Sequence, residues 1–270
     1  MQKFQLSEYL KISGIGSASG IVFTNQSLYI ISDNAGFLYQ YNLESDTLIK
    51  HQLIENPSEN ILKIHKPDFE AITLKENELH IFGSGSTQNR NKSIIFNIEN
   101  QKIQENDFSE TYQNIKNTIQ ISDDELNIEG ALFYKEKLYL FQRGNGANSK
   151  NGIIIIDDNI HFQHIPLPKI KHVETSFTDA ILVKDKIYFL ASAEDTLSTY
   201  DDGEVLGSII GCIDVKTFKI DFTTQISSTH KFEGLTLYEN SQSHLEFLLC
   251  EDNDTEELET KIYKLTISKK

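Results

Sequence analysis

The sequence has no tryptophan, one methionine, four prolines and only two cysteines among 270 residues. Two cysteines, Cys212 and Cys250, cannot build a disulfide framework and do not form a CxxC zinc motif. No apolar run is long enough to span a bilayer, and the N-terminal residues MQKFQLSEYL lack the apolar core of a signal peptide. These absences predict a soluble, cytoplasmic protein.

Basic residues are also scarce, with 25 Lys and Arg against 40 Asp and Glu and a net charge of −15. Nucleic-acid phosphates and anionic membranes are bound by clustered Lys and Arg, so we expect neither as a partner. A hydrophobic content of 39%, including 16 Phe and 11 Tyr, is sufficient for a packed core. We expect a monomer whose partner is a small anionic molecule.

A seven-residue signature occurs five times, as SASGIVF, DFEAITL, NIEGALF, SFTDAIL and KFEGLTL, starting at residues 17, 68, 127, 176 and 231. The third position of the signature is always a hydroxyl or a carboxylate: Ser19, Glu70, Glu129, Thr178 and Glu233. Successive third positions are 51, 59, 49 and 55 residues apart, and 56 residues lead from the last copy through the chain ends to the first. A repeat of this length that closes on itself is typical of propeller blades.

Each signature is followed by a second apolar segment after a short polar turn, which predicts an antiparallel hairpin, and then by a third and a fourth strand. The last repeat has no fourth strand after Ile267, and residues 3–10 have no blade of their own. Pairing residues 3–10 with residues 261–267 would complete the blade and remove two exposed edges. We predict an all-β fold with one domain over residues 1–270, a five-bladed β-propeller of four antiparallel strands per blade, closed by the N-terminal strand.

The segment 107–120 differs from the rest of the repeat. Phe108, Tyr112, Ile115 and Ile119 follow helical spacing, which predicts a short amphipathic helix between the second and third blades. It accounts for the longest interval, and we expect it to cover the edge of a blade.

The first strand of each blade starts at the axis, so the loops that follow the second strands emerge on the same face as the signatures. These loops cover residues 32–36, 84–92, 143–151, 192–207 and 250–260, and they are rich in polar residues. The turns on the opposite face carry ordinary Lys, Glu and Asn. We therefore place function on the signature face, because sites are usually built on loops that a rigid scaffold holds.

The five third positions should converge on the axis. Three carboxylates close together repel one another, which either raised pKa values or a bound cation must relieve. Ligands that are all oxygen favour Ca²⁺. We therefore predict a calcium site formed by five residues: Ser19, Glu70, Glu129, Thr178 and Glu233. The alternative is a water-filled channel in which these groups hydrogen-bond the neighbouring blade.

Three further residues on this face are catalytic candidates. Arg143, in the sequence RGNG, could bind a carboxylate or a phosphate, or it could be an exposed turn residue. Asp33 could orient water or cap its loop, and Asp179 could support the axial groups or stabilise a turn. The acidic loop formed by AEDT at residues 193–196 together with Tyr200 and Asp201 could line a pocket or lie in solvent.

The signature, together with FQRGNG, SFTDA and AEDT, resembles an uncharacterised bacterial family of five-bladed propellers related to phytase-like esterase domains. The resemblance covers nearly the whole chain and implies the fold. The chain is more distantly similar to soluble calcium-activated nucleotidases, the apyrases. Their axial calcium is held by hydroxyl, carboxylate, carboxylate, hydroxyl and carboxylate, the order found at the five third positions here.

These observations favour a calcium-dependent hydrolase of a small anionic ester, a phosphoester or nucleotide, at the mouth of the axial channel. The ion would neutralise the substrate and polarise it or the attacking water. The alternative is a non-catalytic binding module with a structural axial ion. A third interpretation, carbohydrate processing, needs a carboxylate pair flanking a sugar bond, and the loops have few aromatic residues to stack on sugars.

Overall fold

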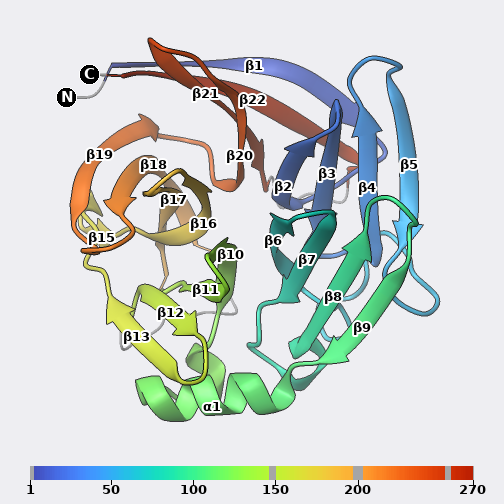
Figure 1. Cartoon of the computed structure of the whole chain (residues 1–270), viewed down its shortest axis with the longest axis horizontal. Helices are drawn as coiled ribbons and strands as arrows, with labels where there is room; N and C mark the ends of the chain where they lie inside the picture. Colours follow the sequence, from blue (N-terminus) through green and yellow to red (C-terminus); the bar gives the residue numbers. More distant parts are fainter. Residues whose placement is uncertain (1–2, 146–149, 197–202, 253–256, 270) are drawn as a thin grey trace.

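The computed structural model describes residues 3–145, 150–196, 203–252 and 257–269. Their strands form five four-stranded antiparallel sheets arranged as blades in a ring (Figure 1). The first two blades contain β2 (Ala18–Thr24), β3 (Ser27–Ser32), β4 (Phe37–Asn42) and β5 (Thr47–Gln52), then β6 (Phe69–Lys75), β7 (Glu78–Gly83), β8 (Lys92–Asn97) and β9 (Ile103–Asp107). The third and fourth contain β10 (Ile128–Tyr134), β11 (Lys137–Gln142), β12 (Gly152–Ile156) and β13 (Ile160–His164), then β16 (Ser176–Val183), β17 (Lys186–Asp195), β18 (Glu204–Asp214) and β19 (Ile220–Ser227).

The fifth blade joins the two ends of the chain. It contains β20 (Phe232–Asn240), β21 (His244–Glu251) and β22 (Glu259–Ser268), with β1 (Phe4–Ser13) as its outermost strand. The two terminal strands are antiparallel, from Phe4 opposite Ile267 to Ser13 opposite Glu259, and they lie side by side in Figure 1. The predicted five-bladed propeller and its closure by the N-terminal strand are confirmed.

Apolar side chains on the faces of the blades pack against the next blade around the ring. Phe177 of β16, for example, contacts Phe141 of the third blade with ring centroids 5.2 Å apart, and Phe189 of its own blade at 5.1 Å. All three rings are fully buried. Edge-to-face aromatic contacts of this kind add to the stability that burial provides.

The predicted helix is also confirmed. Helix α1 (Ser109–Ile119) directly follows β9 and buries Tyr112, Ile115 and Ile119. The hydroxyl of Tyr112 donates a hydrogen bond to the carbonyl of Gly83 in the second blade at 2.6 Å. No helix among the described residues has the length and apolar character needed to cross a membrane.

One hairpin was not predicted from the sequence. Strands β14 (Lys169–Ile170) and β15 (Val173–Glu174) pair with each other between the third and fourth blades. They form a two-stranded sheet separate from the five blades.

Every innermost strand contains an irregularity at the third position of its signature. In all five blades the register with the second strand shifts across this residue, for example between Ile128 and Gly130. A β-bulge of this kind adds one unpaired residue and redirects its side chain. The next position is Gly in three blades, and a Cβ at Gly130 would lie 3.1 Å from the backbone nitrogen of Ala180 in the fourth blade. The bulge and the glycine together let neighbouring strands approach closely at the axis.

Candidate site at the propeller axis

The innermost and second strands of each blade bring polar side chains to one face, as the topology predicted. In four blades a backbone hydrogen bond joins the end of the second strand to the start of the innermost strand. The donor is the N–H of the residue directly after the second strand, and the acceptor is the carbonyl of the residue two positions before the bulge, as in the 2.8 Å bond from Arg143 to Asn127. In the fourth blade Ser176 lies opposite Ser192 in the same relation. Three positions in each blade therefore gather here: the bulged residue, the residue two before it, and the residue opposite the latter, which lies within β17 in the fourth blade and directly follows the second strand in the others. All fifteen are polar: Ser17, Ser19, Asp33, Asp68, Glu70, Ser84, Asn127, Glu129, Arg143, Ser176, Thr178, Ser192, Lys231, Glu233 and Asp252.

The two axial hydroxyls bond to the next blade. Ser19 Oγ donates to the carbonyl of Phe69 at 2.5 Å, and Thr178 Oγ1 donates to the carbonyl of Phe232 at 2.6 Å. Both residues are buried. Their protons therefore hold adjacent innermost strands together, as in the alternative interpretation of the axial ring, while each oxygen keeps lone pairs for a further contact.

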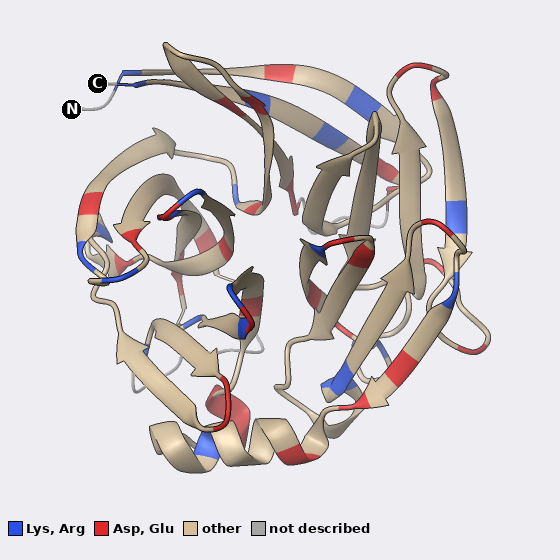
Figure 2. Ribbon diagram, viewed as in Figure 1, with Lys and Arg blue, Asp and Glu red and all other residues tan. Residues whose placement is uncertain are grey.

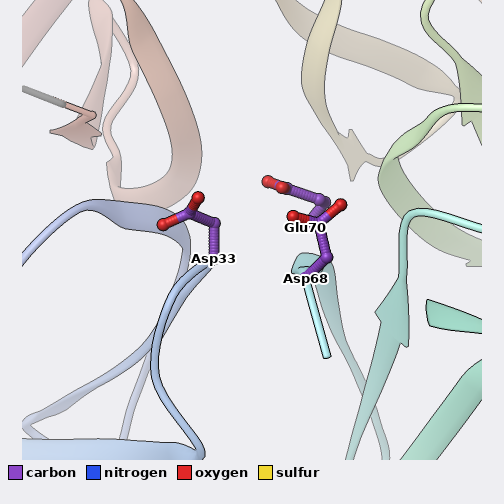
Figure 3. A group of neighbouring side chains, drawn as sticks. All are labelled: Asp33, Asp68 and Glu70. Carbon is purple, nitrogen blue, oxygen red and sulfur yellow. The ribbon is translucent and has the colours of Figure 1, made fainter. Parts of the chain in front are cut away.

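Three carboxylates from the first two blades form a compact group. One oxygen each from Asp33, Asp68 and Glu70 lies within 4.8 Å of the others. Figure 3 shows Asp33 on the loop after β3, facing Asp68 and Glu70 at the start of β6. The group consists only of oxygen donors, and Asp33 Oδ1 is buried with no hydrogen-bond partner. This donor set fits a calcium ion.

Two basic residues neutralise part of this group. Lys66 Nζ forms ion pairs with Asp33 and, at 2.8 Å, with Asp68. Arg90 Nη1 lies 2.7 Å from the other oxygen of Asp68. Glu70 makes no ion pair or hydrogen bond with any described residue, so it keeps the least compensated charge of the three.

The pKa values reflect this unequal compensation. Burial raises the pKa of Asp33 to about 6, although the ammonium of Lys66 opposes the shift. Burial raises the pKa of Glu70 well above its usual range, and the neighbouring carboxylates of Asp68 and Glu129 raise it further. For Lys66, burial would lower the pKa, but the carboxylates of Asp68 and Asp33 outweigh it and raise the pKa.

A second charged cluster joins the third, fourth and fifth blades. Arg143 Nη1 lies 3.1 Å from Glu129, and its Nη2 lies 2.9 Å from Glu194. Lys231 Nζ lies 2.9 Å from Glu233 and 3.1 Å from Glu194. Glu194 thus connects the two cations, and in Figure 2 basic and acidic segments lie next to one another on the strands around the centre. This cluster compensates two of the three axial glutamates within the protein itself.

The catalytic candidates occupy different environments. Arg143 is 6% exposed and paired with carboxylates, so its terminal nitrogens already have partners on the axis. Asp179 is 2% exposed, and its two oxygens accept the N–H groups of Ala180 and, in the fifth blade, Leu235. Asp179 therefore ties two blades together. Asp33 is the candidate with an unpaired oxygen.

Lys66 and Lys231 were not identified from the sequence as parts of the site, whereas Glu194 lies in the AEDT segment that was predicted to line a pocket or to lie in solvent, and it does line one. A signal for Lys231 exists, because a residue two positions before the axial residue points to the same face of a strand. Lys66 lies on the loop before β6, where no repeat position indicates the axis. The loop residues Tyr200 and Asp201 lie outside the described residues.

A pocket of about 770 Å³ opens beside the second cluster. It is bounded by Arg143 and Asn145 after β11, by the hairpin β14–β15, and by Glu194 and Asp195 at the end of β17. A pocket of this size can hold a small molecule.

Residues 14–267 match a family of unknown function, DUF6929. The chain belongs to this family. No curated protein matches it.

Among solved structures, the chain is similar to the PQQ-bound form of aldose sugar dehydrogenase from Streptomyces coelicolor, with 9% identity, a TM-score of 0.58 and coverage of 99% of each chain. It is also similar to a structural genomics protein of unknown function from Bacteroides thetaiotaomicron, with 9% identity, a TM-score of 0.50 and coverage of 98% of this chain and 76% of the other. At such identity the likeness supports the fold alone.

Proposed function

We propose that the chain is a calcium-dependent hydrolase of a small anionic ester, a phosphoester or a nucleotide, which acts at the axial face. The observation that carries the proposal is the group formed by Asp33, Asp68 and Glu70, whose oxygens lie within 4.8 Å of one another on two blades. When bound, calcium supplies charge neutralisation for the substrate and polarises the ester or its attacking water. The axial order shared with the apyrases adds to this proposal.

Asp33 is our candidate for orienting and deprotonating water. One of its oxygens has no hydrogen-bond partner and can accept a hydrogen bond from water, and burial raises its pKa to about 6 in the protein without calcium. Arg143 already pairs with Glu129 and Glu194, so we assign it the role of neutralising these carboxylates and not that of binding the substrate. Asp179 acts as a structural tie.

The first test measures calcium binding, and a variant of Lys66 makes this test specific to the proposed site. The ammonium of Lys66 pairs with Asp33 Oδ2 and Asp68 Oδ1, on the same carboxylates that would bind a cation, so its positive charge opposes calcium binding. Lys66→Met keeps the aliphatic stem and removes this charge, and it should tighten calcium binding in calorimetry by about tenfold or more, whereas Glu70→Gln should weaken it. Lys92→Met, at an exposed ion pair with Glu105, is the matched control and should leave the affinity unchanged. Equal affinities in all four proteins would place calcium elsewhere or nowhere.

Catalysis is tested separately, with phosphomonoesters, nucleotides, phytate and lactones, each with calcium and with chelator. We expect chelator-sensitive turnover that falls in Asp33→Asn and is lost in Glu70→Gln. Arg143→Ala is a poor probe, because it leaves Glu129 buried without its ion-pair partner and removes one of the two cations that pair with Glu194, and so destabilises the fold. Turnover that ignores the chelator would refute the calcium-dependent mechanism.

The alternative is a non-catalytic binding module, and the ion-pair networks favour it specifically. Lys66 and Lys231 already compensate carboxylates at equivalent ends of two blades, as a purely structural network requires. Calcium binding without turnover of any of the four ester classes would support this module over the hydrolase.

A further inference from the structure

The pocket beside the second cluster is built by parts of the chain that the propeller itself does not need. Its outer wall is the hairpin β14–β15, a sheet separate from the five blades. Its innermost residues, Arg143 and Glu194, have side chains only 7% and 6% exposed. An added wall over a buried, charged floor is a built feature that the fold alone does not explain.

The lining excludes several kinds of ligand. Val173 is the only apolar side chain among the described residues that line the pocket, and the imidazole of His172 is the only ring. Nucleobases and other flat groups bind on aromatic surfaces, and the described part of the lining offers no aromatic side chain other than the imidazole of His172. The specificity of a ligand would therefore come from hydrogen bonds to the polar side chains of the lining.

The charges of the lining are balanced in pairs. Arg143 pairs with Glu194 at 2.9 Å, His172 lies 3.3 Å from Asp195, and Lys169 lies 3.9 Å from Glu174. A ligand carboxylate would meet Glu194, and a ligand ammonium would meet Arg143. A neutral ligand avoids both repulsions.

Two residues of the lining each carry a buried hydrogen-bonding atom that the protein leaves unused. Arg143 Nε is a buried donor without a partner, and Asn145 Oδ1 is a buried acceptor without a partner. Leaving such atoms unpaired costs free energy unless water or a ligand satisfies them. A hydroxyl group can accept one hydrogen bond and donate another, so it matches both atoms without adding charge.

We propose that this pocket binds a small, neutral, polyhydroxylated compound, a sugar or a polyol. Binding rests on hydroxyl groups that complement Arg143 Nε and Asn145 Oδ1, with further hydrogen bonds to the charged pairs at the rim. Since calcium takes no part, this site is independent of the proposed calcium chemistry.

The test is calorimetric titration of the full chain, with chelator present, against monosaccharides, their methyl glycosides and linear and cyclic polyols. We expect saturable binding of at least one of these compounds. Asn145→Leu removes the acceptor at nearly constant volume and should weaken that binding by about tenfold. Asn114→Leu, on the exposed face of α1, is the matched control and should bind as the wild type does.

Each other outcome is decisive. Preferential binding of amino acids, inorganic phosphate or nucleosides, titrated in parallel, would overturn the neutral ligand class. Absence of saturable binding of every sugar and polyol, or equal binding by Asn145→Leu and the wild type, would overturn the site. If methyl glycosides bind as tightly as free sugars, the pocket tolerates a substituent on the anomeric oxygen. The ligand can then be the terminal sugar of a glycan as well as a free sugar.

Discussion

At the scale of single residues, the axial positions look equivalent in the sequence but have different surroundings. Ser19 and Thr178 bond to the backbone of the next blade, and Glu129 and Glu233 pair with Arg143 and Lys231. Only Glu70 makes no ion pair or hydrogen bond with the described residues, although its carboxylate helps to raise the pKa of Lys66. The repeat therefore places five similar side chains at the axis. The partners of each side chain decide whether it stabilises the ring or can bind a ligand.

The pH dependence of stability should reveal the uncompensated charge of Glu70. Its folded pKa is raised, so its contribution to stability is fully present below the unfolded pKa near 4.5 and is lost as the pH rises through the folded pKa. Without calcium, Glu70→Gln should therefore unfold at a higher temperature than the wild type above neutral pH, with a gain of about 1.4 kcal/mol per unit of raised pKa. Thermal melts from pH 4 to 9 measure this, and the two proteins should converge near pH 4. A variant less stable at every pH would contradict an uncompensated Glu70.

Asp179 should matter for folding more than for chemistry. Asp179→Ala leaves the buried N–H groups of Ala180 and Leu235 without their acceptor, which should lower the free energy of unfolding by about 2 to 4 kcal/mol. Asp179→Asn retains one acceptor oxygen and should lose less. Urea denaturation measures both, and a neutral Asp179→Ala would refute the tie between the fourth and fifth blades.

At the scale of elements, the two elements inserted between blades, α1 and the hairpin β14–β15, have different roles. The hairpin β14–β15 walls a pocket, and α1 covers the second and third blades through buried side chains of one face. The helix α1 could be predicted from the sequence because the apolar residues of an amphipathic helix recur every three or four residues. A hairpin with two residues per strand has no such period, so it could not be predicted.

The helix should therefore contribute to stability through its buried face. Ile115→Ala removes a fully buried side chain and should cost about 2 to 5 kcal/mol, since the cavity left behind cannot collapse completely. Asn114→Ala, on the adjacent exposed position, is the control and should stay within about 0.5 kcal/mol of the wild type. Similar losses at both positions in chemical denaturation would contradict this packing.

At the scale of the whole molecule, the ring depends on contact between the two ends of the chain. β1 supplies the fourth strand of a blade whose other three strands come from the last forty residues. β1 covers the edge of β22 that would otherwise be unpaired, and unpaired edges invite aggregation.

Deleting residues 1–10 removes most of β1 and should lower the melting temperature of the entire domain in one cooperative transition. It should also promote association in size-exclusion chromatography, because β22 then presents an unpaired edge. Deletion of residues 1–2 alone, which precede β1, is the control. A truncated chain that melts with the wild type would show that closure adds no stability.

The sequence by itself determined the blade number, the closure and the face that carries the polar residues, because these depend on the spacing of the signature and on strand alternation. It also placed Ser19, Glu70, Glu129, Thr178 and Glu233 at equivalent positions. Only the tertiary structure decided their partners, since Lys66 and Glu194 reach the axis from segments with no repeat position there. Charge compensation depends on distances across blades, and a period along the chain carries no information about those distances.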